Sequence, residues 1–417
     1  MLFIAGLLIK RKSLISKIAI LFCFFFQHQF IFAQRYDIVI KGGNVIDPKT
    51  SISDVLDIAI SSGKIVTIAK GIETKSAEHV INASGMYVVP GLIDIHTHDF
   101  YGPHPDRAFC NGTASMIPDS FTFCSGVTTV VDAGSSGWKD FPVFKNKIID
   151  NSRTRVLAFL NIVGSGMRGG GYEQNAGDMD GKKAAMMAQK YRDYIVGFKL
   201  AHFKGREWMP VDEAIKAGKI AKLPVMIDFG DNATPLSVKE LFLTHMRPED
   251  IFTHCFAELK GRETIVDLDT KKLKPSVWEA KHKGIQFGVG YGEISFAFSQ
   301  ATPAVKAGFY PDFLSTDMHT SLMGNKMKDL PNIMSKFLAL GMSIQDIIRT
   351  VTWNPAREIS HEELGNISAG GIADITILSL INGKFEFYDH SGHEIEGSKK
   401  FECITTIKEG RIVYSIK

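Results

Sequence analysis

A chain of 417 residues, 45% of them hydrophobic and 22% charged, has the composition of a folded globular protein and can form one large domain with a smaller companion. Its formal net charge of +3 gives no reason to expect a nucleic-acid partner. The sequence shows no low-complexity run and no repeat of solenoid period, which argues against a repeat architecture.

Residues 1–33 have the three parts of a secretory signal peptide. Four basic residues and no acidic one precede an apolar run over 18–26, and the small residue Ala33 follows before polar sequence begins. We expect cleavage after Ala33 and a secreted or periplasmic mature protein. The alternative is an uncleaved membrane anchor, but the apolar run is short against the roughly 20 residues that a spanning helix needs. We therefore expect no stable membrane insertion.

Both ends of the remaining chain alternate apolar and polar residues over short stretches, which is the pattern of antiparallel strands. In residues 34–89 the pattern covers 36–47, 57–60, 64–69 and 87–89. In residues 359–417 it covers 373–378, 384–388 and 411–416. We predict that the two ends together form one small β-sandwich domain beside a central domain.

The central segment, residues 90–358, alternates apolar strands with helical stretches such as 181–194 and 331–340. The expected strands are Leu92–His96, Thr128–Asp132, Arg155–Asn161, Ile195–Lys199, Pro224–Asp228, Ile251–His254, Ile285–Val289 and Phe313–Asp317. Eight strands that alternate with helices predict an α/β fold, a (β/α)8 TIM barrel. An open doubly wound sheet is the alternative, which the lack of a Gly-x-Gly-x-x-Gly turn after the first strand weakens.

Ligand-type side chains recur where these apolar strands end. They are His96, His98, Lys199, Asp228, His254 and Asp317. The carboxyl ends of barrel strands converge on one face, so we expect these side chains to meet in one small space. Imidazole and carboxylate groups suit Zn²⁺ and neighbouring transition metals. Singly, each residue has an ordinary explanation as a hydrogen-bonded histidine, a rim charge or a helix cap, whereas the set predicts a metal centre.

Lys199 needs a separate explanation, because a protonated lysine repels metal ions. An uncharged lysine amine can react with CO2 to give a carbamate, which is a carboxylate on a long stem that can bridge two cations. Buried lysines near positive charge lose their proton readily. The position of Lys199 among metal ligands therefore suggests a carbamate.

Four cysteines follow the signal peptide, and their pairing is open. They are Cys110, Cys124, Cys255 and Cys403. Four cysteines in a chain this long are no disulfide framework. Their spacing allows a pair between Cys110 and Cys124, and buried free thiols are the alternative.

Several stretches carry a more specific pattern. The first is Pro90-Gly-Leu-Ile-Asp-Ile-His-Thr-His98, and the others cover 197–199, 253–256, 314–317, 354–357 and 365–374. These stretches resemble the motifs of the amidohydrolase superfamily, and in particular its dihydroorotase-like amidohydrolase/deacetylase metallohydrolases. The resemblance covers roughly residues 36–417. It implies two divalent metal ions, zinc or alternatively manganese, with a carbamylated lysine bridge and a catalytic aspartate.

Three positions depart from the pattern of that family. Asp228 stands where strand five usually offers a histidine, and Tyr291 stands where a histidine commonly precedes the glycine. Ala201 stands where close relatives place an arginine thought to stabilise the transition state. Oxygen of Asp228 can still bind a metal, so we expect Asp228 and His254 to hold the second ion.

His202, Tyr291 and Arg168 are the candidates to replace the missing arginine, and His202 ranks first because it stands close to Lys199. Arg168 lies in a glycine-rich loop over 164–172, from which its guanidinium could meet a substrate carboxylate. Together with Tyr291 and His319 we treat Arg168 as a substrate-binding candidate. Ordinary packing is the competing explanation for each of them.

The expected chemistry is hydrolysis of an amide or ester bond by a metal-activated hydroxide that attacks the carbonyl carbon. Asp317 would act as general base and then as general acid, while His96, His98 and Asp317 hold the first metal. The expected substrate is a small acylated molecule of the deacetylase or N-acyl amino acid type. The alternatives are a cyclic amide, as in dihydroorotases and hydantoinases, and a non-catalytic metal-binding relative. An oligomer is possible.

Overall fold

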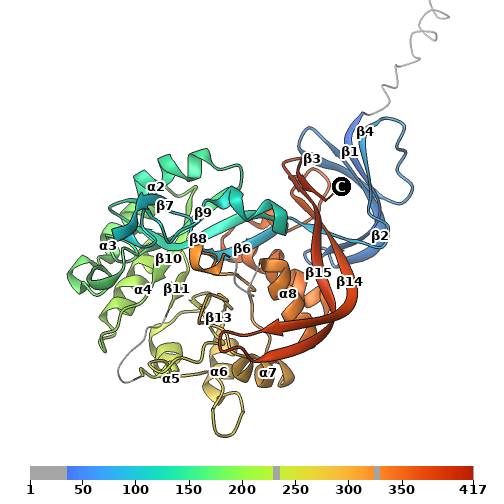
Figure 1. Cartoon of the computed structure of the whole chain (residues 1–417). Coiled ribbons are helices and arrows are strands. Elements are labelled where there is room, and N and C mark those ends of the chain that lie inside the picture. Colours follow the sequence, from blue (N-terminus) through green and yellow to red (C-terminus); the bar gives the residue numbers. More distant parts are fainter. Residues whose placement is uncertain (1–34, 229–234, 324–328, 417) are drawn as a thin grey trace, which may run out of the picture.

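The computed structural model describes residues 35–228, 235–323 and 329–416. The expected signal peptide lies outside these residues. Two assemblies of strands stand side by side in Figure 1, a curled parallel sheet and a second sheet built from both ends of the chain. This arrangement confirms the predicted fold class.

Seven parallel strands form the curled sheet, and neighbours along the chain are neighbours in the sheet. The strands are β6 (Leu92–Thr97), β8 (Val127–Gly137), β9 (Arg155–Asn161), β10 (Ile195–Leu200), β11 (Val225–Ile227), β12 (Ile251–Phe252) and β13 (Gln286–Phe287). Nearly all of their residues are buried. Burial on both faces explains why the sequence shows continuous apolar runs here rather than alternation.

The eighth barrel segment is extended chain rather than a regular strand. Phe313 forms an isolated parallel bridge to Gly288, and Met318 forms one to Thr97, so the segment closes the barrel between β13 and β6. Asp317 interrupts strand geometry with a φ of 56°, in the left-handed region. The predicted eighth strand is therefore present as an extended segment held by two isolated bridges. Its last residue, Asp317, does not have strand geometry.

Helices surround this sheet in Figure 1. They are α2 (Phe141–Lys147), α3 (Gly181–Lys190), α4 (Met209–Ala221), α5 (Val238–Glu240), α6 (Pro275–Lys283), α7 (Phe298–Lys306), α8 (Leu330–Ala339), α9 (Ile344–Val351) and α10 (Trp353–Glu358). The two predicted helices are α3, which ends at Lys190 rather than at 194, and α8. Within the described ranges, every helix is too short or too polar to span a bilayer.

The second sheet contains eight strands, and both ends of the chain contribute to it. They are β1 (Tyr36–Asp47), β2 (Ile52–Ser61), β3 (Lys64–Ala69), β4 (Ala77–Asn82), β5 (Tyr87–Pro90), β14 (Ile375–Tyr388), β15 (Glu394–Lys408) and β16 (Arg411–Ser415). The two ends meet where β5 pairs antiparallel with β14. Isoleucines from both ends share one core, since Ile40, Ile58 and Ile375 are all fully buried in the same cluster.

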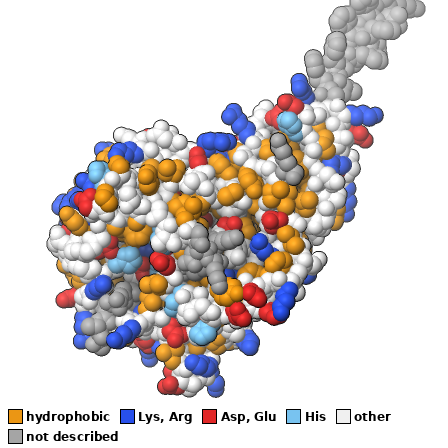
Figure 2. Space-filling view, in the orientation of Figure 1, with side chains coloured by type: hydrophobic (Ala, Val, Ile, Leu, Met, Phe, Trp, Pro, Cys, Tyr) orange, Lys and Arg blue, Asp and Glu red, His pale blue; other side chains and the backbone are white. Residues whose placement is uncertain are grey.

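The hairpin of β14 and β15 extends from this sheet along α8 towards the barrel (Figure 1). On the face drawn in Figure 2, acidic and basic side chains are interspersed with apolar ones.

A short strand, β7 (Tyr101–His104), follows β6. The four cysteines of the described residues are free; three are buried, and Cys124 is exposed, so the Cys110–Cys124 pair does not form.

Candidate metal centre

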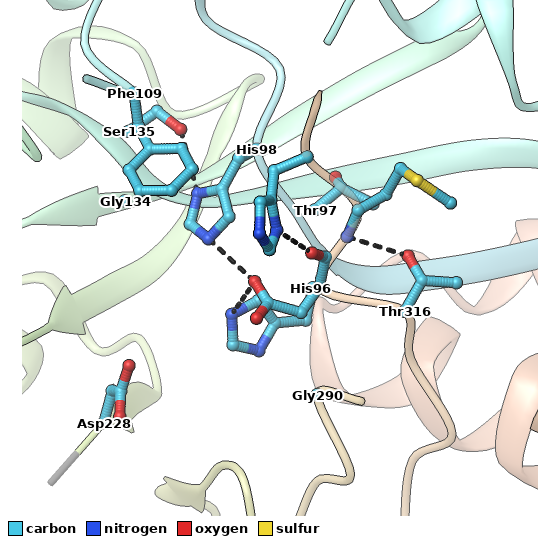
Figure 3. Close-up of polar contacts among 12 residues, drawn as sticks. His96, Thr97, His98, Phe109, Gly134, Ser135, Asp228, Gly290 and Thr316 are labelled. Atoms are coloured by element: carbon cyan, nitrogen blue, oxygen red, sulfur yellow. Dashed lines mark hydrogen bonds and ion pairs between the residues drawn. The ribbon is translucent and has the colours of Figure 1, made fainter. Parts of the chain in front are cut away.

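His96 and His98 lie at the carboxyl end of β6 and face the same carboxylate. The Nε2 atoms of the two rings lie 3.4 Å and 2.9 Å from Oδ1 of Asp317. The other nitrogen of each ring is also engaged. His96 Nδ1 lies 2.9 Å from the Thr253 hydroxyl, and His98 Nδ1 lies 3.1 Å from the hydroxyl of Ser135, which is labelled in Figure 3. These contacts fix both rings with Nε2 directed to the centre, as outer hydrogen bonds do for metal-binding histidines.

Lys199 enters the same space from β10. Its side chain is fully buried, and its Nζ lies 3.2 Å from His96 Nε2 and 3.8 Å from Oδ2 of Asp228. Burial lowers the pKa of Lys199, which favours the uncharged amine. Gly134 permits this approach, because a β-carbon there would stand 2.7 Å from the lysine Cβ.

Asp228 and His254 follow β11 and β12 and face each other at 3.2 Å between Oδ2 and Nε2. Nδ1 of His254 lies 2.6 Å from the carbonyl oxygen of Gly290. A β-carbon at Gly290 would come within 2.9 Å of the rings of both His254 and His96, so glycine is required there. Asp228 is drawn apart from the β6 histidines in Figure 3, on the β11 side of the centre.

Two of the converging side chains stand on strained backbone. His254 has a φ of 52° and Asp317 a φ of 56°, a region that residues other than glycine seldom adopt. Such strain persists only where the surrounding structure imposes it, and it is concentrated at functional sites. The left-handed backbone at these two positions is thus part of how the structure presents both side chains to the centre.

The electrostatics of the cluster suit a cation. Burial lowers the pKa of His96 and of His98, so both rings are held neutral. Burial alone would raise the pKa of both carboxylates, Asp228 and Asp317. The nearby His254 and Lys199 outweigh it and hold the pKa of Asp228 well below its usual range. The β6 histidines likewise lower the pKa of Asp317. Neutral imidazoles beside ionised carboxylates are the donor set that divalent transition metals prefer.

The distances are also compatible with a metal ion. One ligand atom each from His96, His254 and Asp317 lie within 4.8 Å of one another, and all three residues are buried. His98, Lys199 and Asp228 surround this trio at the distances given above. The structure thus brings together all six residues that the sequence proposed as metal ligands.

A pocket of about 250 Å³ opens onto the cluster. Its wall combines ligand candidates with apolar and polar residues: His98, Phe109, His202, Asp228, His254, Leu259, Arg262, Glu293, Ile294, Ser295, Asp317 and His319. Phe109 packs against His98 with ring centroids 4.5 Å apart (Figure 3). The pocket can therefore take a small molecule with an apolar part and place it directly on the carboxylates.

His202 and His319, two of the remaining sequence candidates, line this pocket. His202 lies with Nε2 3.5 Å from Oδ2 of Asp228, while its Nδ1 lies 2.8 Å from Oε2 of the buried Glu173. His319 lies with Nδ1 2.6 Å from the backbone carbonyl oxygen of Asp317. Both positions allow contact with a bound substrate.

Tyr291 and Arg168, the other two candidates for binding substrate, are not among the residues that line this pocket. The Tyr291 ring stacks on Phe296, and its hydroxyl donates to the Tyr388 carbonyl and accepts from Lys336, at 2.5 Å and 2.6 Å. The hydroxyl thus already donates one hydrogen bond and accepts another. The Arg168 guanidinium instead stacks on Tyr172, with its carbon 4.4 Å from the ring centroid.

Two residues of the site were missed in the sequence. Arg262 places Nη1 3.3 Å from Oδ1 of Asp228, and Glu173 holds His202 as described above. Both come from loops that follow strands, at positions with no fixed spacing from a ligand motif. For Arg262 the one available signal was the replacement of histidine by Asp228, since a buried extra carboxylate calls for a cation. The sequence contains no comparable signal for Glu173.

A closed parallel barrel that gathers imidazoles and carboxylates at the carboxyl ends of its strands is the architecture of a metal-dependent hydrolase. Residues 294–413 match the Amidohydrolase family. A deacetylase from Agrobacterium fabrum is 31% identical over 355 residues, covering 83% of this chain and 84% of that protein. A deacetylase from Brucella anthropi is 31% identical over 348 residues, 82% of this chain and 83% of its own.

Solved structures agree with this assignment. An adenine deaminase superimposes with a TM-score of 0.81 at 27% identity, over 91% of this chain and 100% of its own. A dihydroorotase superimposes with a TM-score of 0.79 at 26% identity, over 91% of this chain and 99% of its own. The chain belongs to the amidohydrolase family and is a hydrolase of carbon–nitrogen bonds other than peptide bonds.

Proposed function

We propose that this amidohydrolase removes an acyl group from a small molecule, in the manner of a deacetylase or N-acyl amino acid hydrolase. The observation that carries the proposal is the Asp317 carboxylate, which lies between the β6 histidines and forms part of the pocket wall. The two relatives that cover most of the chain at 31% identity are both named deacetylases, which supports the same class of substrate.

The residues that would hold metal fall into two groups. His96, His98 and Asp317 would hold one ion, and Asp228 with His254 would hold a second. Lys199 lies between the groups, where its carbamate would serve both. Divalent cations bound there, zinc or manganese, would acidify water and polarise the carbonyl of the substrate.

The protein's own groups then orient the substrate and move the proton. Asp317 is ionised and accessible from the pocket, so it can accept a proton from the attacking water and return it to the leaving group. His202 lines the pocket with Nε2 3.5 Å from Oδ2 of Asp228, where it can donate a hydrogen bond to the developing oxyanion. Glu173 holds the other nitrogen of His202 and thereby directs Nε2 towards the pocket.

A cyclic amide is the second candidate substrate. It is favoured by the dihydroorotase structure, which superimposes over 91% of this chain. The pocket offers no contrary feature, because its apolar residues Phe109, Leu259 and Ile294 would accept a flat ring as readily as a short acyl chain.

Metal analysis of the purified protein followed by two substrate panels tests the proposal. We expect one or two divalent ions per chain, turnover of N-acetyl amino acids or acetyl esters, and no turnover of hydantoins or dihydroorotate. Removal of metal with a chelator should abolish turnover, and added Zn²⁺ or Mn²⁺ should restore it. Turnover confined to the cyclic amides would reject deacylation in favour of ring opening.

A further inference from the structure

Asp228 divides its two carboxylate oxygens between different partners. Oδ2 faces the centre, at 3.2 Å from His254 Nε2, 3.5 Å from His202 Nε2 and 3.8 Å from Lys199 Nζ. Oδ1 faces away from it, at 3.3 Å from Nη1 of Arg262. A carboxylate held in this way can offer a single oxygen to a cation and cannot rotate freely.

Arg262 is itself held on several sides. Its Nη2 donates to the backbone carbonyl of Thr253 at 2.6 Å, and its guanidinium carbon lies 5.0 Å from the centroid of the Phe252 ring. The side chain is only 3% exposed, although it contributes to the pocket wall. One rigid guanidinium therefore bridges Asp228 and the backbone next to His254, the two residues proposed above for the second metal.

The charges of the pair compensate for each other. An aspartate in place of a neutral imidazole adds one negative charge to the centre, and the buried guanidinium adds one positive charge beside it. Arginine suits this task because its planar fork makes two directed hydrogen bonds at once and keeps its charge when buried. A lysine could supply the charge but not both bonds.

We propose that Asp228 and Arg262 act as one unit that takes the place of the histidine usual on strand five, with Arg262 as a positioning residue for Asp228. The unit presents one oxygen towards the metal and leaves the net charge of the centre as an imidazole would. This inference rests on the proposed metal centre and assigns to Arg262 a role beyond contact with substrate.

Metal affinity, measured by competition with a chromophoric chelator, tests the proposal without any substrate. We expect Arg262→Lys and Arg262→Gln each to weaken binding of at least one ion by about 10–100-fold, the usual effect of removing a partner of a metal ligand. Asp228→His alone should also weaken binding, because it leaves the guanidinium buried against a cation. The double variant D228H/R262Q should regain at least about tenfold over either single variant, since coupled residues are not additive.

Arg247 provides the matched control. It forms a similar pair with Asp250, at 2.6 Å between Nη2 and Oδ1, but at the opposite end of β12. Arg247→Gln should leave metal affinity unchanged even where it lowers the melting temperature. Unaltered affinity in Arg262→Lys, or a double variant as weak as the summed single losses, would overturn the pairing. A parent protein that binds no metal would instead reject the proposed function.

Discussion

Lys199 is the residue whose chemistry depends most on its surroundings. It is fully buried between His96 and Asp228, and burial favours the neutral amine that CO2 can modify. We expect Lys199→Ala to lose metal and to lower kcat/KM by more than about 100-fold, because a bridging ligand is gone. Acetate or propionate should restore part of both, measured as metal content and rate.

The exposed Lys190 at the end of α3 is the control for this change, and its replacement by alanine should alter neither quantity. An intact metal complement in Lys199→Ala would contradict the carbamate. So would a high-resolution structure with metal bound and an unmodified lysine amine pointing away from it.

The pair of Glu173 and His202 gives a prediction about pH. Burial lowers the pKa of His202, but the hydrogen bond to Glu173 and the charge of Asp228 outweigh it and raise this pKa above its usual value. If the protonated ring stabilises the oxyanion, activity is present below this pKa and falls as pH rises through it. Glu173→Gln removes one stabilising charge, so the alkaline limb of the kcat profile should move to lower pH.

His202→Ala should lower kcat by about 10²-fold with a smaller effect on KM, as loss of an oxyanion donor does. Glu293→Gln, at another carboxylate that lines the pocket, is the comparison variant and should leave the alkaline limb in place. An unchanged limb in Glu173→Gln would remove His202 from this role.

The ligand residues could be predicted because each follows an apolar strand, which is a property local to the sequence. Arg262 and Glu173 could not, since loops bring them to the site and their place depends on packing across the barrel. The direction of the Tyr291 ring could not be predicted for a related reason. Gly290 and Gly292 on either side of it have positive φ values of 47° and 58°, so strand alternation does not predict where its ring points.

At the scale of elements, α8 connects the barrel to the β14–β15 hairpin through a buried cation. Lys336 on α8 is 1% exposed and donates to the Tyr291 hydroxyl at 2.6 Å. Burial lowers the pKa of Lys336 to about 7. The helix thus carries a charge into the core at neutral and acidic pH.

This burial predicts a pH-dependent stability. Between pH 7 and about 10.4, the ordinary lysine value, the unfolded chain binds more protons at Lys336 than the folded one does. Stability therefore rises with pH in this window and is lowest below it. Relative to Lys336→Met, the free energy of unfolding of the parent should rise by up to about 1.4 kcal/mol per pH unit.

Denaturant unfolding at several pH values measures this difference, with Lys399→Met at an exposed position of β15 as the control. A parent and Lys336→Met that keep a constant difference from pH 7 to pH 10 would refute the assignment.

Element boundaries show where sequence patterns stop being informative. The alternation of strands and helices predicted the barrel, because burial of parallel strands imposes apolar runs. The pattern could not show that the eighth segment leaves the ladder at Asp317, since this turn follows from contacts with β6. The strands at the two ends were likewise foreseen, but their joining into one hydrogen-bonded sheet depends on the pairing of β5 with β14.

For the whole molecule, the basic and apolar residues of 1–33 lead us to propose export. When the full-length chain is expressed in a bacterium, N-terminal sequencing of the mature protein should begin near Gln34, in the periplasmic or secreted fraction. Replacing Lys10, Arg11, Lys12 and Lys17 by glutamate should hold the precursor in the cytoplasm. A soluble cytoplasmic protein that retains residues 1–30 would be inconsistent with this proposal.

The pairing of β5 with β14 also sets the order in which the molecule can be completed. The ribosome releases β1 to β5 first, and β5 can pair with β1 at once, yet β14, its partner on the other edge, is made only after the entire barrel. Until then Val88, Val89 and Pro90 present an unpaired edge on the side that β14 later covers, and the buried isoleucines of the first strands lack C-terminal neighbours such as Ile375 and Ile377. Contacts between such distant segments form slowly. Folding of the second sheet is thus completed only when the C-terminal strands are synthesised and β14 pairs with β5.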